Sequence, residues 1–201
     1  MDVTENLDVG GRLLTLVHPP DATALIDEEA FEREEFLPYW AELWPSAVVL
    51  ARAVAARRPQ RLHVVELGCG LALPAIAAAL EGARVLATDW SPDALAYAQR
   101  NAGANGAVVE TLRVAWAEPD ELVARGPFDL VLAADVLYER RNVPQLLALL
   151  PRLATEVLLA DPGRPALPAF LEGADAAWLV TRDAVPELPR GGVYRLARHV
   201  R

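Results

Sequence analysis

Short apolar runs alternate with stretches of helical periodicity along most of this chain. Each run is bounded by turn-forming or charged residues, a pattern typical of strands that lie inside a sheet. Phe128–Ala134 is dominated by apolar residues, as expected of a strand that is covered on both faces. The expected strands are Arg61–Leu67, Arg84–Thr88, Val108–Val114, Phe128–Ala134, Glu156–Ala160, Ala177–Arg182 and Val193–His199.

Helices are expected between these strands, where apolar residues recur every three or four positions. Pro45 stands where a helix can begin, because its missing backbone donor has no effect in the first turn. Ser91-Pro92-Asp93 supplies a hydroxyl cap, a proline and an acid near the positive end of the helix dipole. Asn142-Val143-Pro144-Gln145 resembles another capped start. The expected helices are Pro45–Arg57, Leu71–Leu80, one that opens at Ser91, Val143–Leu153 and a short one near Pro165–Leu171.

The order of these elements predicts an α/β fold with a mostly parallel sheet, helices on both faces and an antiparallel hairpin at the C-terminal end. A separate hairpin is expected from Val3 to Val17, around Gly10-Gly11. The acidic stretch from Asp27 to Glu35 is expected to be a solvated surface segment. We expect one domain over residues 1–201, with the hairpin and the acidic segment in 1–36 and the cofactor-binding core in 37–201.

A glycine-containing loop marks the end of the first core strand. The run from Val64 to Gly70 ends in Glu66-Leu67-Gly68-Cys69-Gly70, and the next strand ends in the lone carboxylate of Asp89. In an open α/β sheet such glycines let the backbone approach a ligand, and the acid on the second strand accepts hydrogen bonds from ribose hydroxyls. The glycines alone would equally fit an ordinary strand-to-helix turn. Together with Asp89 they predict an adenosine-containing cofactor.

The residues around the loop favour S-adenosylmethionine over a nicotinamide dinucleotide. A dinucleotide loop normally has a third small residue three positions after the second glycine, where this chain has Leu73. Glu66 would also repel a pyrophosphate at close range. S-adenosylmethionine has no phosphate and carries an ammonium and a sulfonium, both of which a nearby carboxylate attracts.

The ends of the later strands should face the same crevice. Trp116 follows the third core strand, and with Trp90 it could form apolar walls around an adenine ring; plain packing is the alternative for both. Asp135 leaves the fourth strand and Tyr138 follows three residues later, so both side chains could line the mouth of the site. A surface turn is the alternative there. Asp161 ends the fifth strand.

Composition narrows the class of protein. The 201 residues are 53% hydrophobic and 23% charged, which suits a globular domain with a sizeable core. No apolar run reaches the roughly 18 residues of a membrane span, and Met1–Glu5 lacks the features of a signal peptide. The single cysteine, Cys69, allows no internal disulfide and fits a reducing compartment, so we expect a cytoplasmic protein. Separately, we expect a monomer.

Charge and histidine placement exclude further classes. The formal net charge of −9 argues against general affinity for nucleic acid. All 19 basic residues are arginine, which we attribute to a biased genome. His18, His63 and His199 are scattered along the chain, and no pair of histidines or cysteines has metal-ligand spacing, so no metal is expected.

Four motifs together resemble the seven-β-strand methyltransferases of the family-16 lysine methyltransferase group. They are the run from Pro38 to Ala47, the loop from Glu66 to Gly70 with Asp89, Asp135-Val136-Leu137-Tyr138 and Asp161-Pro162-Gly163-Arg164. The last motif resembles the branch that includes the electron-transfer-flavoprotein β-subunit lysine methyltransferase; some bacterial members are labelled nicotinamide-N-methyltransferase-like. The likeness runs from about Leu37 to Arg164. It implies a Rossmann-like sheet of seven strands.

The resemblance also implies roles for individual residues. It implies that Glu66, Gly68 and Gly70 hold the methionine end of S-adenosylmethionine and that Asp89 holds its ribose. It also implies that Trp44 and Trp116 flank the cofactor, and that Asp135 and Tyr138 belong to the methyl-transfer centre. Trp90 joins the cofactor set from the strand-end argument above. Two positions depart from the family pattern, because Ala72 replaces the usual third glycine and Ala115 replaces an acid. Adenine recognition would then rest on backbone groups or on Trp116.

These expectations point to an N-methyltransferase that acts on a protein lysine. A small-molecule amine or heterocycle methyltransferase with the same cofactor site is the second hypothesis. A catalytically inactive binder of S-adenosylmethionine is the third, and a dehydrogenase is disfavoured by Leu73 and Glu66. The expected partner is therefore a lysine-bearing protein or a small amine, with no role for nucleic acid or membrane.

Overall fold

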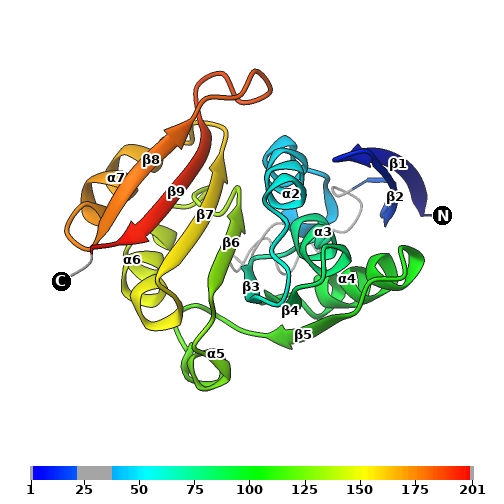
Figure 1. The fold of residues 1–201 in the computed structure, drawn as a ribbon, viewed down its shortest axis with the longest axis horizontal. Helices are drawn as coiled ribbons and strands as arrows, with labels where there is room; N and C mark the ends of the chain where they lie inside the picture. The colour runs from blue at the N-terminus through cyan, green and yellow to red at the C-terminus, as the bar shows by residue number, and fades with distance from the viewer. Residues whose placement is uncertain (1, 22–37, 200–201) are drawn as a thin grey trace, which may run out of the picture.

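A sheet of seven strands forms the centre of the molecule (Figure 1). The structure is a computed structural model that describes residues 2–21 and 38–199. The strands lie in the order β5-β4-β3-β6-β7-β9-β8; the first five are parallel, and β9 runs antiparallel to β7 and β8. They are β3 (His63–Leu67), β4 (Arg84–Asp89), β5 (Val109–Arg113), β6 (Leu130–Ala134), β7 (Glu156–Asp161), β8 (Trp178–Asp183) and β9 (Gly192–Arg198). The predicted sheet and its antiparallel end are confirmed.

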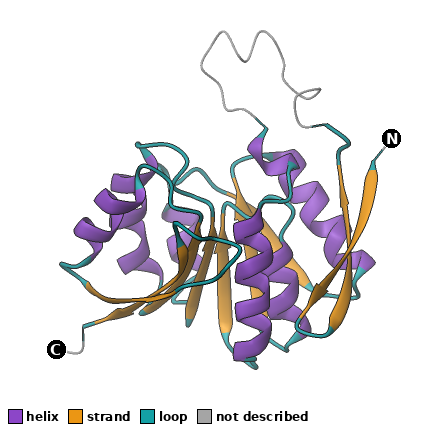
Figure 2. Cartoon of the chain, turned by 90° about the horizontal axis from the view of Figure 1, so that it is seen from above, coloured by secondary structure: helices purple, strands orange, loops and turns teal. Residues whose placement is uncertain are grey.

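Helices cover both faces of this sheet, as Figure 2 shows from above. One face carries α2 (Pro45–Arg57), α3 (Leu73–Leu80) and α4 (Pro92–Ala104). The other carries α5 (Asp120–Arg125), α6 (Asn142–Leu153) and α7 (Leu167–Ala174). A short 3₁₀ turn, η2 (Tyr39–Ala41), precedes α2.

The central strands bury side chains on both faces with a period of two. In β6, Leu130 and Leu132 belong to the apolar cluster under α2 and α3, while Val131 and Ala133 belong to the cluster under α6 and α7. None of the four is more than 1% exposed. This alternation explains the near-continuous apolar sequence of the strand.

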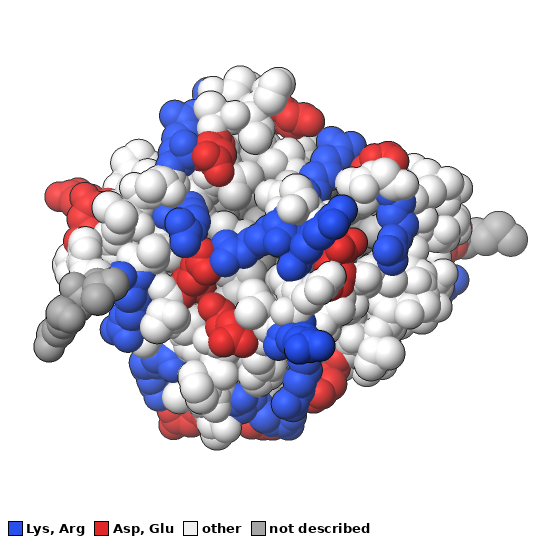
Figure 3. All heavy atoms as spheres, in the orientation of Figure 1, with Lys and Arg blue, Asp and Glu red and all other residues white. Residues whose placement is uncertain are grey.

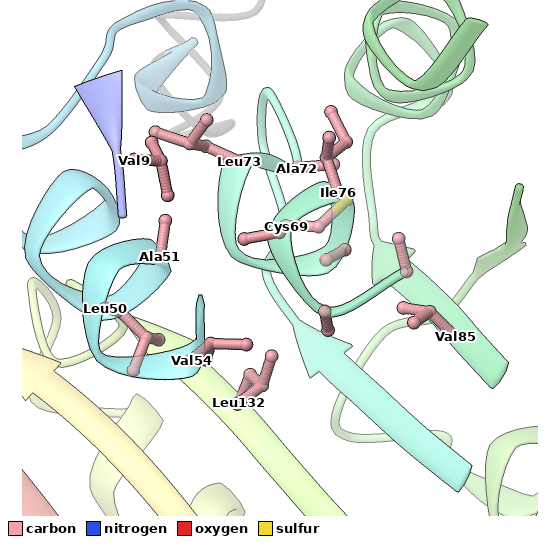
Figure 4. Close-up of a cluster of buried hydrophobic side chains, with 14 of the residues drawn as sticks. Val9, Leu50, Ala51, Val54, Cys69, Ala72, Leu73, Ile76, Val85 and Leu132 are labelled. Carbon is pink, nitrogen blue, oxygen red and sulfur yellow. The ribbon is translucent and has the colours of Figure 1, made fainter. Parts of the chain in front are cut away.

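The predicted N-terminal hairpin forms an outer layer on the helices. Strands β1 (Val3–Val9) and β2 (Arg12–His18) pair antiparallel, and they lie outside α2 and α4 (Figure 2). Figure 4 shows Val9 beside Ala51 of α2 and close to Leu73 of α3. The hairpin thereby extends one apolar cluster outward from the sheet.

Asn101 of α4 and Asn105, the C-cap residue of this helix, hold the free edge of β2. Asn101 Oδ1 accepts the Val17 N–H at 2.8 Å, and its Nδ2 donates to the carbonyls of Val17 at 3.1 Å and Leu71 at 3.2 Å. Asn105 pairs with both backbone groups of Thr15, at 2.9 and 2.7 Å. Each side-chain amide therefore offers this edge one donor and one acceptor, as the backbone of a neighbouring strand would. Asn101 in addition joins the hairpin to the loop that precedes α3.

Several local expectations need correction. Helix α3 begins at Leu73 rather than Leu71, because Ala72 adopts a left-handed conformation with φ 61°. The capped start expected at Asn142 is wrong: α6 begins there without a side-chain cap, and Asn142 Nδ2 donates to the Val136 carbonyl at 2.9 Å. Helix α5 and the turn η2 were not expected. The acidic stretch Asp27–Glu35 lies outside the described residues.

Acidic and basic side chains lie next to one another on the face of the molecule that Figure 3 shows. Glu156, at the start of β7, forms ion pairs with both Arg57 and Arg195.

Among the described residues, every helix is too short or too polar to cross a membrane.

Candidate active site

A cavity of about 770 Å³ lies where β3, β4 and β6 end, within the usual size range of small-molecule sites. Such a place is expected for a ligand of an open α/β sheet, beyond the carboxyl ends of its strands. All the predicted site residues line this cavity: Trp44, Glu66, Gly68, Gly70, Asp89, Trp90, Trp116, Asp135 and Tyr138. The structure brings them together; the role of each one stays a prediction.

The loop after β3 depends on its two glycines. Gly68 and Gly70 have φ values of +62° and +48°, which side-chain-bearing residues rarely adopt. A Cβ at Gly68 would lie 3.3 Å from Cζ2 of Trp116, and one at Gly70 would lie 3.1 Å from the Trp40 carbonyl oxygen. The loop is therefore packed between these two tryptophan-containing segments, and its backbone is exposed to the cavity.

Asp89, at the end of β4, organises the same loop. Its Oδ2 accepts the Gly70 N–H at 3.0 Å, and its Oδ1 accepts the Ser91 N–H at 3.0 Å. Burial raises the pKa of the carboxyl, against the lowering effect of these backbone bonds. Each carboxylate oxygen can accept more than one hydrogen bond, so the predicted ribose contact is compatible with this arrangement.

Glu66 lies behind the loop, only 1% exposed. Its Oε2 accepts the Ala75 N–H at 2.8 Å and so satisfies a free donor in the first turn of α3. Burial raises the pKa of this carboxyl well above its usual range, and the charge of Asp89 adds to the effect. A cationic ligand would favour the ionised forms of these two buried carboxyl groups, whereas a phosphate would oppose them.

Asp135, just beyond β6, is paired with an arginine that the sequence analysis gave no role. Arg164 Nε donates to Asp135 Oδ1 at 2.7 Å, and the Asp135 side chain is only 4% exposed. The aspartate has φ 56°, an uncommon conformation that is typical of functional positions. The Arg164 guanidinium carbon lies 5.3 Å from the ring centroid of Trp44.

Three aromatic rings form a wall next to this ion pair. The Tyr39 ring lies 5.1 Å from that of Tyr138 and 6.3 Å from that of Trp44, between centroids. The Trp44 indole N–H donates to the Tyr39 carbonyl at 2.8 Å. Burial, followed by the charges of Glu139 and Asp89, raises the pKa of Tyr138 to about 12, so its hydroxyl stays protonated at neutral pH.

Asp161 does not line the cavity, contrary to expectation. Its Oδ1 accepts the N–H groups of Gly163 and Arg164, both at 2.7 Å, so it shapes the turn that carries Arg164. Its Oδ2 is buried without a hydrogen-bond partner. The short motif from Asp161 to Arg164 was the sequence signal for this arrangement.

The tryptophans expected around adenine have different surroundings. The Trp116 ring packs beside Gly68, as the close approach of its Cζ2 shows. The Trp90 carbonyl accepts a hydrogen bond from Arg113 Nε at 2.9 Å, and Arg113 itself lines the cavity. Trp40 is a further lining residue without a predicted role; its carbonyl covers Gly70.

No group of three or more histidine, cysteine, aspartate or glutamate side chains within residues 2–21 and 38–199 is arranged to hold a metal ion. The groups that line the cavity are suited to an organic cation. They are carboxyl groups, aromatic rings and loop backbone.

The chain is similar to known methyltransferases. The lysine methyltransferase family matches residues 34–160. Protein N-lysine methyltransferase METTL21A of Danio rerio is 35% identical over 130 residues, covering 60% of this chain and 59% of that protein. The electron transfer flavoprotein beta subunit lysine methyltransferase of Xenopus laevis is 34% identical over 137 residues, 63% of this chain and 53% of that protein. The histone-arginine methyltransferase METTL23 of Xenopus laevis is 35% identical over 116 residues, 54% and 49% of the two chains. This chain thus spans about half to three fifths of the length of these curated relatives.

Solved structures share the fold. A 16S rRNA N2 methyltransferase (RsmC) of T. Thermophilus, in complex with AdoMet and guanosine, has a TM-score of 0.68 at 16% identity, over 99% of this chain and 51% of that chain. The magnesium protoporphyrin IX methyltransferase of Synechocystis, with bound SAM, has a TM-score of 0.59 at 18% identity, over 89% and 98%. At these identities the likeness shows the fold alone.

Proposed function

Because this chain belongs to the lysine methyltransferase family, we propose that it is an S-adenosylmethionine-dependent N-methyltransferase that modifies a lysine side chain of another protein. One observation carries the proposal: a loop with two positive-φ glycines and two buried carboxylates shares a single cavity with an acid and three aromatic rings. The first set suits an adenosyl cation, and the second suits an amine.

The cavity has the features that S-adenosylmethionine requires. Gly68 and Gly70 bring bare backbone to the cavity, and the ammonium of the methionine end would favour the negatively charged form of the buried Glu66. Asp89 would hold the ribose, while Trp44, Trp90 and Trp116 would flank the cofactor. When bound, S-adenosylmethionine supplies an electrophilic methyl group on a positively charged sulfur.

The acceptor end must hold a neutral amine close to that methyl group. A lysine amine has a pKa of about 10.4, so its deprotonation at pH 7 costs roughly 4–5 kcal/mol. Alignment of the reactants can contribute about 7–11 kcal/mol, which exceeds that cost. In the proposed roles Asp135 orients the amine, and Tyr138 supplies an aromatic wall and a hydrogen bond.

The test is incubation of the protein with radiolabelled S-adenosylmethionine and a cell extract separated by size. We expect label in macromolecules, recovered as methyl-lysine after acid hydrolysis. Since the enzyme contains no lysine, such label cannot arise from methylation of its own side chains. Label in methyl-arginine, or only in the small-molecule filtrate, would replace the proposed acceptor; label in neither would remove the activity.

Asp135→Asn tests the acceptor site directly. We expect it to reduce turnover strongly while the affinity for S-adenosylhomocysteine stays within a few fold, because the cofactor contacts are made elsewhere. Asp120→Asn is the matched control: its side chain is 93% exposed outside the cavity, and turnover should not change. Full activity of Asp135→Asn would remove this residue from the mechanism.

A further inference from the structure

Arg164 is one of the charged residues that line the cavity and to which the proposed function gives no task. We propose that Arg164 is a positioning residue of the methyl-transfer centre, which holds the Asp135 carboxylate and compensates its charge next to the sulfonium. The acceptor nitrogen then meets a neutral ion pair instead of a free anion. This inference rests on the proposed function, since it presumes the adenosyl sulfonium donor.

The geometry of the pair supports this task. The Nε–Oδ1 distance of 2.7 Å joins a 31% exposed arginine side chain to a 4% exposed aspartate side chain, so most of the aspartate's environment is the protein and this cation. A charged hydrogen bond of this length is a strong one. The face of the Trp44 ring limits the guanidinium on another side.

The loop that carries Arg164 is built to be fixed. Asp161 Oδ1 accepts two successive backbone N–H groups, of Gly163 and of Arg164 itself. Gly163 has φ +94°, and a Cβ there would lie 2.9 Å from backbone atoms of Arg190, so another segment presses on the turn. These contacts fix the position of the Arg164 backbone, as expected of a residue that stays in the site when the acceptor binds.

Asp135 lies next to the cofactor loop. Strands β3 and β6 are neighbours, with Leu67 paired to Ala133, so Gly68 and the residues after Ala134 leave the sheet side by side. A Cβ at Gly68 would lie 3.4 Å from Cγ1 of Val136, the residue that follows Asp135. A charge on Asp135 therefore acts on whatever the glycine loop holds.

Charge compensation has a chemical consequence for the transfer. The nitrogen lone pair forms the new N–C bond, the C–S bond breaks with its electrons remaining on sulfur, and the extra proton leaves the nitrogen for water. A free carboxylate would stabilise both the starting sulfonium and a protonated amine, and so would bind the ground state more tightly without helping the transition state. The guanidinium offsets that effect while it keeps the carboxylate oriented to accept an amine N–H.

The test compares the dissociation constants of S-adenosylmethionine and S-adenosylhomocysteine by calorimetry. These ligands differ by the methyl group and the positive charge on sulfur, so the ratio of their constants reports the local charge, and no methyl acceptor is needed. In Arg164→Met we expect S-adenosylmethionine to gain roughly three- to tenfold relative to S-adenosylhomocysteine. A purely structural role for Arg164 would weaken both ligands together and leave the ratio unchanged.

Three further variants complete the experiment. Arg164→Lys keeps the positive charge, and Arg164→Met with Asp135→Asn removes both charges, so each should restore the wild-type ratio within about twofold. Arg113→Met removes another cavity arginine that bonds to the Trp90 carbonyl, and it should also leave the ratio unchanged. An unchanged ratio in Arg164→Met, or a ratio that stays shifted in the double variant, overturns the inference. Wild-type protein that binds neither ligand overturns the proposed function itself, and the inference with it.

Discussion

The asparagine that fastens the N-terminal hairpin should be among the residues most important for stability. Asn101 is fully buried, and its side chain bonds to the N–H and C=O of Val17 and to the C=O of Leu71. Asn101→Ala leaves all three backbone groups without this partner. A buried group that loses its partner costs about 1–3 kcal/mol, and carbonyls tolerate the loss better than an N–H.

The expected loss is therefore about 2–4 kcal/mol in the free energy of unfolding. Asn105→Ala, at the C-cap of the same helix, is the matched control. It removes the same pair of contacts from Thr15 and a third hydrogen bond, from Nδ2 to the Asn101 carbonyl at 2.8 Å, but at a half-buried position where water can replace the amide, so the expected loss is about 1 kcal/mol or less.

Urea unfolding followed by far-ultraviolet circular dichroism measures both changes. An unchanged m-value would show that the comparison is between similar native and denatured states. A loss in Asn101→Ala that is equal to or smaller than that in Asn105→Ala would refute the argument from burial.

Three other changes test the cofactor end and the aromatic wall. Gly70→Ala should lower the free energy of unfolding by about 1–2 kcal/mol and weaken S-adenosylhomocysteine binding, because it combines left-handed strain with a close approach to the Trp40 carbonyl; wild-type values in urea unfolding and calorimetry would contradict this. Glu66→Gln should be more stable than wild type at about pH 8 but not at about pH 4, because a carboxyl with a raised native pKa loses stability as pH rises through that pKa; the same variant should bind S-adenosylmethionine less tightly. Tyr138 should ionise at about pH 12 in the native protein, seen as the difference between ultraviolet titrations of wild type and Tyr138→Phe, and wild type should lose stability relative to this variant between about pH 10 and 12.

Local chemistry accounts for the elements that sequence reasoning placed well. The Ser91 hydroxyl accepts the Ala94 N–H at 3.3 Å, as its position before Pro92 predicted, and α2 begins at Pro45. Such signals act over a few residues and need no knowledge of the fold. Helix α5 gave no comparable signal, because its six residues contain one buried side chain, Leu122, and too few turns for a period.

Non-local geometry explains what was missed. Ala72 itself has no preference for a left-handed conformation, so its identity did not announce the late start of α3; the signal was the glycine that the family usually has at this position. The pairing of Arg164 with Asp135 depends on β6 and β7 being neighbours, and on a turn that points the arginine back across the sheet edge. Asn101 did carry a readable signal: a polar residue among the buried positions Ala94, Ala98 and Ala102 of one helix face.

The candidate site was predictable as a set of residues more than as a set of contacts. Its members stand at the ends of adjacent strands, and parallel strands bring their ends to one edge. The hydrogen bonds were not predictable in this way. Asp89 accepts the Gly70 N–H and Glu66 accepts the Ala75 N–H, so both carboxyl groups bond to the backbone as well as facing the cavity. That supporting role emerges only when the loop conformation is known.

The lining of the cavity comes from distant parts of the chain: Trp40 and Trp44 lie between β2 and β3, and Arg164 lies after β7. During synthesis on the ribosome, the glycine loop emerges well before Arg164, which lines the same cavity. A nascent chain that ends with β6 therefore has the residues proposed to hold the cofactor, but it lacks Asp135, Tyr138 and Arg164 of the proposed methyl-transfer centre. We expect the methyl-transfer centre to be complete only after β7 and the turn at Gly163 have been added, which makes methyl transfer, rather than cofactor binding, a reporter of completed folding.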